Sequence, residues 1–311
     1  WDKRDLEEAL GYLQSHPTGV WNDIGGWRWR SHIAGHVVGA VMYEIETPDR
    51  KILWTGDFDT RDSPTTHGAQ PVQADVLFME ATYGGSDHPE RAAEEQRFID
   101  RVVEVVERGG TALVPVFANG RSQDVLTLLW KSKLKLNVHF DGMGQRVTKT
   151  FLENPEFVND PKRLKEVFHW SKRVSSKSDR KKALSADVIV TTSGMLDGGP
   201  SIWYLNRLRN DPRNAILLTG YQAEGSGGRL LTETGRLQIF GKLTDIPLEV
   251  DRFALSNHAG QKQLLEFALA TGAPDVILFH SDPDVRPTLA ALLEKEGVQV
   301  HMPRNHESYT I

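Results

Sequence analysis

Short apolar runs that alternate with helical patterns constrain the fold of this chain more than any other feature. Strand-like runs occupy residues 74–80, 110–117, 186–192, 214–219 and 275–279, and helical patterns follow most of them. Strand–loop–helix units of this length form mostly parallel sheets covered by helices. We therefore predict an α/β protein, and the length of 311 residues suggests about two domains.

A predicted hairpin precedes these units. Residues 41–46 alternate apolar and polar side chains, and a turn at 47–50 leads into the next strand. The hairpin should bring His36 close to Asp57, and glycines flank the histidine and precede the aspartate. Histidine and carboxylate are a ligand pair of zinc, although residues in such positions also serve as ordinary turn and cap residues.

Composition excludes several classes of protein. The chain has no cysteine, so any zinc must be bound by His, Asp or Glu, and the lack of thiols fits a cytoplasmic protein. No apolar run approaches the roughly 18 residues that a membrane span needs. The formal net charge of -5 argues against a basic coat over the whole surface.

Four polar residues follow the carboxyl ends of predicted strands, namely Asp57, Glu80, His258 and His280. Ligands of open α/β sheets gather at this edge. Each residue alone has an ordinary explanation as a helix cap or as the polar end of a strand. The four together favour a site assembled from several loops.

Seven short motifs lie in order along the chain, at residues 34–40 (AGHVVGA), 54–58 (WTGDF), 80–84 (EATYG), 114–121 (VPVFANGR), 192–196 (TSGML), 220–225 (GYQAEG) and 256–259 (SNHA). In sequence and order they resemble the β-CASP group of metallo-β-lactamase-fold nucleases. This group includes the cleavage-and-polyadenylation endonuclease, its archaeal relatives and ribonuclease J.

The resemblance implies a fold and a function. It implies an αββα-type metallo-β-lactamase domain, lacking its first strands, formed by residues 1–84 and 250–311, with an α/β β-CASP domain inserted at 85–249. The implied activity is that of a zinc-dependent ribonuclease that hydrolyses phosphodiester bonds of single-stranded RNA. RNA is the implied partner, beside a second copy of the chain or subunits of a processing complex, and no membrane is involved.

The resemblance also implies roles for individual residues. His36 would bind one zinc ion, His280 a second, and Asp57 would bridge the two and serve catalysis. Glu80 would orient His258, which would protonate the leaving oxygen. A histidine at position 280 is typical of the RNA-processing members. The implied substrate-binding residues are Arg121, Ser193, Gly194, Tyr221 and Ser256.

The chain departs from the family pattern in three places. It contains no His-x-His-x-Asp-His motif, which supplies half of the expected metal ligands, and it begins with Trp1 rather than Met. A longer protein that carries the motif would explain both observations, and the 311-residue chain alone would then be inactive. Asn257 and Ser281 stand where Ala and Gly are usual, which affects the expected loop geometry.

Three functions therefore stay open at this point. A zinc ribonuclease is the leading hypothesis. The alternative is a catalytically inactive RNA-binding or scaffold subunit. A degenerate relative of the family would be a protein of this kind. A small-molecule hydrolase of the same superfamily is disfavoured by the inserted domain and its basic stretch.

A basic stretch lies at residues 161–182. It holds nine Lys or Arg against two acidic residues, and three aromatic residues, Phe168, His169 and Trp170, lie among them. Most such runs are solvated helix faces. Its contrast with the acidic chain favours a surface that follows RNA phosphates, with an aromatic side chain stacking on a base.

Overall fold

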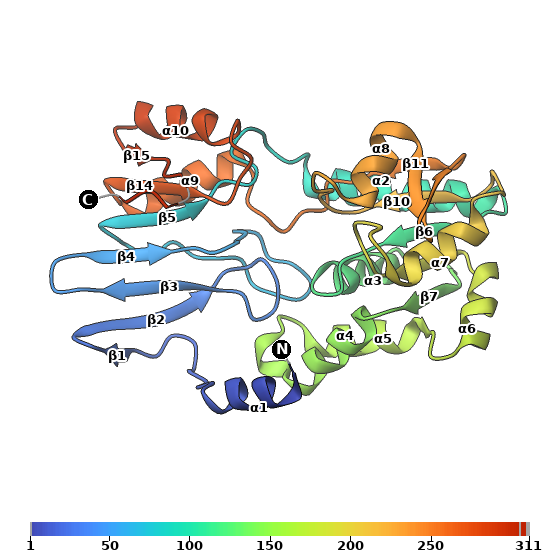
Figure 1. Cartoon of the computed structure of the whole chain (residues 1–311), viewed down its shortest axis with the longest axis horizontal. Helices are drawn as coiled ribbons and strands as arrows, with labels where there is room; N and C mark the ends of the chain where they lie inside the picture. Colours follow the sequence, from blue (N-terminus) through green and yellow to red (C-terminus); the bar gives the residue numbers. More distant parts are fainter. Residues whose placement is uncertain (1, 305, 309–311) are drawn as a thin grey trace.

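Two separate sheets organise the protein, as the computed structural model of residues 2–304 and 306–308 shows. Figure 1 shows the sheets beside each other, and the chain passes from the first to the second after β5 and returns after β13. The predicted α/β class is therefore confirmed, with most of the second sheet formed by one continuous central stretch of the chain.

The first sheet has seven strands in the order β1-β2-β3-β4-β5-β14-β15. The pairs β1–β2, β2–β3 and β3–β4 are antiparallel, whereas β4, β5, β14 and β15 run parallel to one another. The strands are β1 (Asn22–Ile24), β2 (Trp27–Ile33), β3 (Val41–Glu46), β4 (Lys51–Trp54), β5 (Val76–Glu80), β14 (Asp275–Phe279) and β15 (Gln299–His301).

The two faces of the first sheet differ. Helices α9 (Gln261–Thr271) and α10 (Arg286–Lys295) cover one face, and a core that includes Leu77, Met79 and Phe267 lies beneath them. The other face presents aromatic side chains, and Tyr43 and Trp54 remain partly exposed there. Apolar patches of this kind mark interaction sites on soluble proteins.

The second sheet has six parallel strands in the order β13-β10-β6-β9-β7-β8. The strands are β6 (Ala112–Pro115), β7 (Val138–Asp141), β8 (Lys172–Arg173), β9 (Val188–Thr191), β10 (Ala215–Leu218) and β13 (Glu249–Arg252). Alternate residues of the central strands pack into two cores, one on each face. Burial on both faces explains why these strands are continuous apolar runs.

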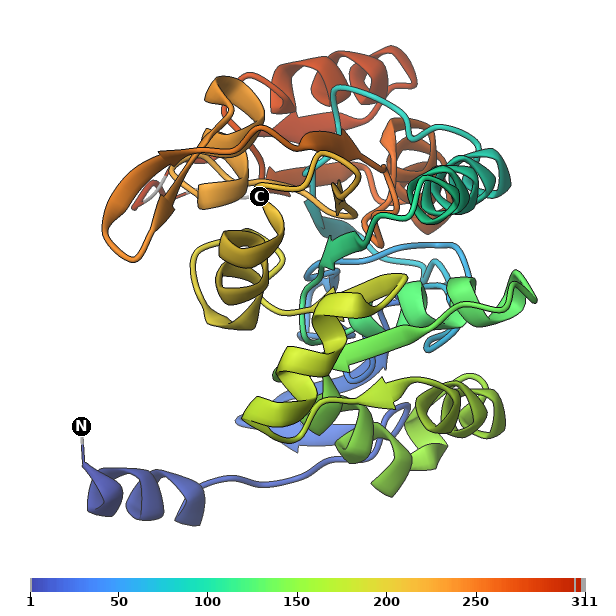
Figure 2. The same ribbon diagram turned by 90° about the vertical axis from the view of Figure 1, so that its right-hand side faces the viewer.

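Helices cover both faces of the second sheet, and a small hairpin adjoins one of them (Figures 1 and 2). The helices that accompany this sheet are α2 (Arg91–Glu107), α3 (Arg121–Lys131), α4 (Gly144–Glu153), α5 (Pro161–Trp170), α6 (Lys177–Lys182), α7 (Gly199–Leu208) and α8 (Gly227–Thr234), with short 3-10 turns at Pro155–Phe157 and Ala183–Ser185. The hairpin joins β11 (Arg236–Ile239) to β12 (Lys242–Asp245). Among the described residues, no helix has the length and apolar character needed to cross a bilayer.

The structure differs from the sequence expectations at three places. Residues 2–15 have the amphipathic pattern of a helix, with Leu6 and Leu10 on its apolar face, but α1 spans only Lys3–Gly11. This face packs on none of the described residues, so Leu6 and Leu10 are exposed. Figure 2 shows α1 standing apart from the body of the protein. The hairpin of β11 and β12 is not anticipated by the sequence analysis. The expected division between residues 249 and 250 falls inside β13, which pairs with β10.

A buried carboxylate holds the antiparallel part of the first sheet. Glu44 on β3 accepts hydrogen bonds from Arg30 Nε at 2.6 Å and His32 Nε2 at 2.8 Å, both on β2. Burial acts to raise the pKa of Glu44, but the hydrogen bonds from the two partners outweigh it and lower the pKa. The carboxylate therefore stays ionised inside the sheet.

We expect Glu44→Ala to reduce the free energy of unfolding by about 1–3 kcal/mol at pH 7, the usual cost of losing hydrogen bonds to a charged group. Because the folded pKa of Glu44 is lowered, its contribution is complete above its ordinary value of 4.5 and is lost as the pH falls through the folded pKa. Urea unfolding at several pH values measures this. The exposed Glu153 gives a control, Glu153→Ala, and equal stabilities of the two variants would contradict the assignment.

Candidate metal centre and substrate pocket

A pocket of about 330 Å³ lies at the carboxyl-terminal edge of the second sheet. Loops that follow β6, β9, β10 and β13 line it, and His36 from the loop before β3 completes the lining. Because parallel strands end at the same edge, loops that are distant in sequence emerge together. The pocket thus lies where the sequence analysis expects a site between the two parts of the chain.

A buried ion pair joins the two sheets beside this pocket. Glu80 ends β5 in the first sheet and is fully buried, whereas His258 lies in the loop after β13 of the second sheet. Its Nδ1–H donates to Glu80 Oε1 at 2.8 Å. The carboxylate also accepts the backbone N–H of Phe58 at 3.0 Å and both the N–H and the hydroxyl of Thr82. These donors replace the water that a buried charge would otherwise need.

The ion pair changes the acidity of both partners. Burial acts to lower the pKa of His258, but the hydrogen bond and charge of Glu80 outweigh it, so the pKa lies above its ordinary value of 6.5. Burial acts to raise the pKa of Glu80, and the hydrogen bonds and charge of its partners, His258 foremost, lower it overall. His258 therefore carries a proton on Nε2 at a pH where most histidines have lost it.

His36 has the opposite environment, although its ring centroid lies only 4.4 Å from that of His258. Burial and the neighbouring positive charge lower the pKa of His36. Its Nδ1–H donates to the backbone carbonyl of Asn257 at 2.9 Å, which leaves the lone pair on Nε2. A Cβ on Gly35 would lie 2.1 Å from the carbonyl oxygen of Asp59, so only glycine lets this loop pass.

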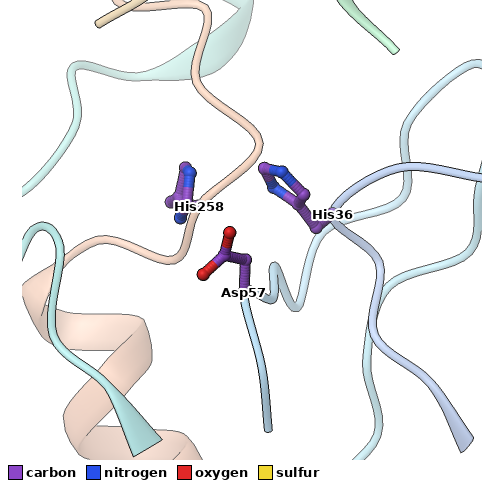
Figure 3. Close-up of side chains that lie close together, drawn as sticks. All are labelled: His36, Asp57 and His258. Carbon is purple, nitrogen blue, oxygen red and sulfur yellow. The ribbon is translucent and has the colours of Figure 1, made fainter. Parts of the chain in front are cut away.

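Asp57 lies between the histidines. Figure 3 shows its carboxylate pointing toward His36 and His258, and ligand atoms of the three residues all lie within 4.8 Å of one another. Its Oδ1 also lies 2.9 Å from Nδ1 of His280, which follows β14. Asp57, Glu80 and His280 form a second such group, so Asp57 belongs to both.

The donor chemistry at this point fits a divalent metal. A neutral imidazole Nε2, a shared carboxylate and a second imidazole are ligands that zinc accepts. His280 has a positive φ of 49°, a backbone conformation that is uncommon for residues other than glycine and that is often found at functional sites. Possible ligands are therefore grouped around Asp57, as the sequence analysis expects for His36 and His280.

A further hydrogen-bonded unit supports the histidine loop. The side chain Nδ2–H of Asn257 donates to Asp124 Oδ2 on α3 at 2.8 Å, while its backbone carbonyl holds His36. Arg121 Nη1 lies 3.3 Å from the same Asp124 oxygen. From the sequence, Asn257 is only a departure from the family pattern and Asp124 carries no signal of a role, because 133 positions separate the two residues.

Three of the five expected substrate-binding residues line the pocket, namely Arg121, Tyr221 and Ser256. Burial lowers the pKa of Arg121 to about 10, which leaves the guanidinium charged at neutral pH. A buried cation in a pocket is suited to holding an anion. The other two residues, Ser193 and Gly194, instead line a neighbouring groove.

The basic stretch forms α5, β8 and α6 at the outer edge of the second sheet. The prediction of a stacking aromatic is wrong for Phe168, because α5 is amphipathic and turns this side chain into the core. Trp170 packs partly against the same core, and His169 is exposed. Arg180 is held by the buried Asp141, with Nε–H donating to Oδ2 at 2.6 Å.

Comparison with known proteins identifies related families. Residues 124–231 match a family model described as the Beta-Casp domain, and residues 244–303 match one described as a Zn-dependent metallo-hydrolase RNA specificity domain. A crystal structure of a protein of unknown function from Enterococcus faecalis V583 has a similar fold, with a TM-score of 0.58 and 14% identity, over 95% of this chain and 66% of that one.

Curated relatives match almost the whole chain. This chain is 37% identical over 302 residues to the probable RNase MJ4 of Methanocaldococcus jannaschii. The match covers 93% of this chain and 70% of that relative. The chain is 37% identical over 284 residues to RNase aCSPSF2 of Saccharolobus solfataricus (89% and 57%) and 27% identical over 339 residues to cleavage and polyadenylation specificity factor 73 of Drosophila melanogaster (98% and 48%). The chain spans about half the length of the last two relatives.

We expect Glu80→Gln to lower the pKa of His258, because the variant keeps the side-chain volume but removes the charge that favours the imidazolium. Histidine NMR signals followed against pH in chelator-treated protein measure this. The exposed Glu90 supplies the control variant, Glu90→Gln, which should leave His258 unchanged. An unaltered pKa of His258 in the Glu80 variant would show that another group sets its acidity.

We expect Asn257→Ala to reduce the free energy of unfolding by about 1–3 kcal/mol, because it removes a hydrogen-bond donor from the buried Asp124 carboxylate. Chemical unfolding followed by tryptophan fluorescence measures the change. The control is Asn210→Ala at an exposed position, for which we expect a change within about 0.5 kcal/mol. A similar small effect at position 257 would argue against the bridging role.

Proposed function

The chain belongs to the β-CASP family of metallo-β-lactamase-fold proteins, and we propose that it acts in a zinc-dependent ribonuclease that hydrolyses phosphodiester bonds of single-stranded RNA. One observation supports this most directly. His36 and His258 lie side by side beside Asp57, yet their pKa values are shifted in opposite directions. One is suited to bind a metal and the other to donate a proton.

The RNA substrate is supported by several features. Relatives that match nearly the whole chain are named ribonucleases, and the matching C-terminal family model is described by RNA specificity. A histidine at position 280 is the residue that RNA-processing members of the family carry. The charged Arg121 in the pocket is suited to a phosphate.

We assign the metal ligands as follows. His36 and His280 would each bind one of two zinc ions, and Asp57 would be shared between them. Bound zinc would supply a water of lowered pKa and would neutralise the charge of the phosphate. These three residues alone supply few ligands for two zinc ions. The number of two zinc ions is therefore part of the proposal.

The remaining steps belong to the chain's own side chains. His258 would give its Nε2 proton to the leaving ribose oxygen, while Glu80 keeps Nδ1–H in place and so fixes the orientation of the ring. Arg121 would attract the phosphate, with Tyr221 and Ser256 at the wall of the same pocket. Ser193 and Gly194 would contact the RNA strand beyond it.

We expect His258→Ala to reduce cleavage of a labelled single-stranded RNA by between about 100-fold and about 10,000-fold, the usual contribution of a general acid. Asp57→Ala should abolish cleavage. The assay uses the natural protein that contains this chain, supplied with zinc. The exposed His67 provides the control His67→Ala, which should cleave at the wild-type rate. Wild-type cleavage by the Asp57 variant would defeat the assignment.

Metal analysis of the same protein separates the two leading hypotheses. A ribonuclease of this kind should retain zinc through purification and lose it on Asp57→Ala. An inactive RNA-binding or scaffold subunit should bind RNA without zinc. Association with a second copy or with processing subunits, and a cytoplasmic location, belong to the proposal as the family suggests them.

A further inference from the structure

The pocket lined by His36, Arg121 and His258 is here called the histidine pocket. A second groove adjoins it at the carboxyl-terminal edge of the second sheet. It has a volume of about 430 Å³ and is formed by the segments that follow β6, β7 and β9. We call it the Phe117 groove. Phe117 and Met195 line both the groove and the histidine pocket, so the two hollows share part of their walls.

The lining of the Phe117 groove differs in character from that of the histidine pocket. Apolar side chains predominate, among them Phe117, Met143 and Pro200, and the one charged side chain among the described residues of the lining is the acidic Asp197. The histidine pocket instead contains the cation of Arg121. A phosphate group would therefore be attracted to the pocket and repelled from the groove, whereas an uncharged, flat group would be accepted by the groove.

Phe117 is placed as a fixed wall between the two hollows. Although it lies only two residues beyond the buried strand β6, 37% of it is exposed. The backbone of Gly220 lies against the ring, and a Cβ at this position would lie 3.1 Å from Cε2 of Phe117. The ring is thus supported from one side by main chain while part of its surface stays open. An aromatic ring held in this way offers a stacking surface.

We infer that the Phe117 groove is a base-binding subsite, which holds the nucleobase of a nucleotide next to the one whose phosphate occupies the histidine pocket. This inference rests on the proposed function. Bases have apolar faces and no net charge, and unpaired bases stack on aromatic side chains in proteins that bind single strands. Because every base has such a face, the subsite accepts all four bases.

Binding measurements test the subsite without relying on cleavage. The protein is titrated into a fluorescein-labelled single-stranded RNA, and binding is followed by anisotropy. The same RNA is then used with one abasic nucleotide placed at each position in turn. We expect one position at which base removal weakens binding by between about 5-fold and about 150-fold, as the loss of one stacked base does.

The decisive comparison combines the abasic RNA with Phe117→Ala. The variant should bind intact RNA more weakly by a similar factor, yet the abasic change at that one position should weaken it no further, because both changes remove the same contact. Phe117→Tyr should restore binding, since tyrosine also stacks. Phe240→Ala removes an exposed aromatic of the small hairpin and serves as the matched control without effect.

The outcomes distinguish this inference from the proposed function. If the abasic change and Phe117→Ala weaken the affinity for RNA independently and multiplicatively at every position, the subsite is overturned. RNA binding by the protein would still stand in that case. If Phe117→Ala binds intact RNA as well as the wild type does, the subsite is likewise overturned. Failure of the wild-type protein to bind any RNA would overturn the proposed function and the subsite together. Circular dichroism of each variant verifies that the fold is retained.

Discussion

The hydrogen bond between Glu80 and His258 is the interaction on which the rest of this arrangement depends. It joins the end of β5 in the first sheet to the loop after β13 in the second. A carboxylate without solvent access must be matched by donors, and His258 is the donor that comes from the other sheet. The energetic need to keep this charge paired therefore also keeps the edges of the two sheets together.

The meeting of two parallel edges explains how residues from distant parts of the chain share one site. Glu80 ends β5, and Asp57 and His280 follow β4 and β14, the two strands that flank β5 in the first sheet. Loops after four neighbouring strands of the second sheet face them. Strand direction thus places possible metal ligands on one side and, on the other, the loops that we propose bind the nucleotide chain. Asn257 contributes to both sides through its backbone carbonyl and its side chain.

Electrostatic interactions give the two neighbouring histidines different protonation behaviour. His36 and His258 are close enough to influence each other, and the protonated His258 is one reason why the pKa of His36 is low. Their hydrogen-bond partners also contribute to the difference in pKa. A backbone carbonyl accepts from the ring of His36, whereas a carboxylate accepts from the ring of His258. A similar separation of charge distinguishes the cationic histidine pocket from the apolar Phe117 groove beside it.

The sequence by itself determined the α/β class and the order of nearly all strands and helices. It also predicted that Asp57, Glu80, His258 and His280 share one site, with His36 brought close to Asp57 by a hairpin. Buried strands must be apolar, and loops after parallel strands must share an edge, so both results follow from local pattern and chain direction. Only the tertiary structure decided that Phe168 is buried, that α1 is left exposed by the described part of the chain, and that Asn257 reaches Asp124. These depend on which surfaces meet across long separations in sequence, and the local pattern of residues carries no distance between such surfaces.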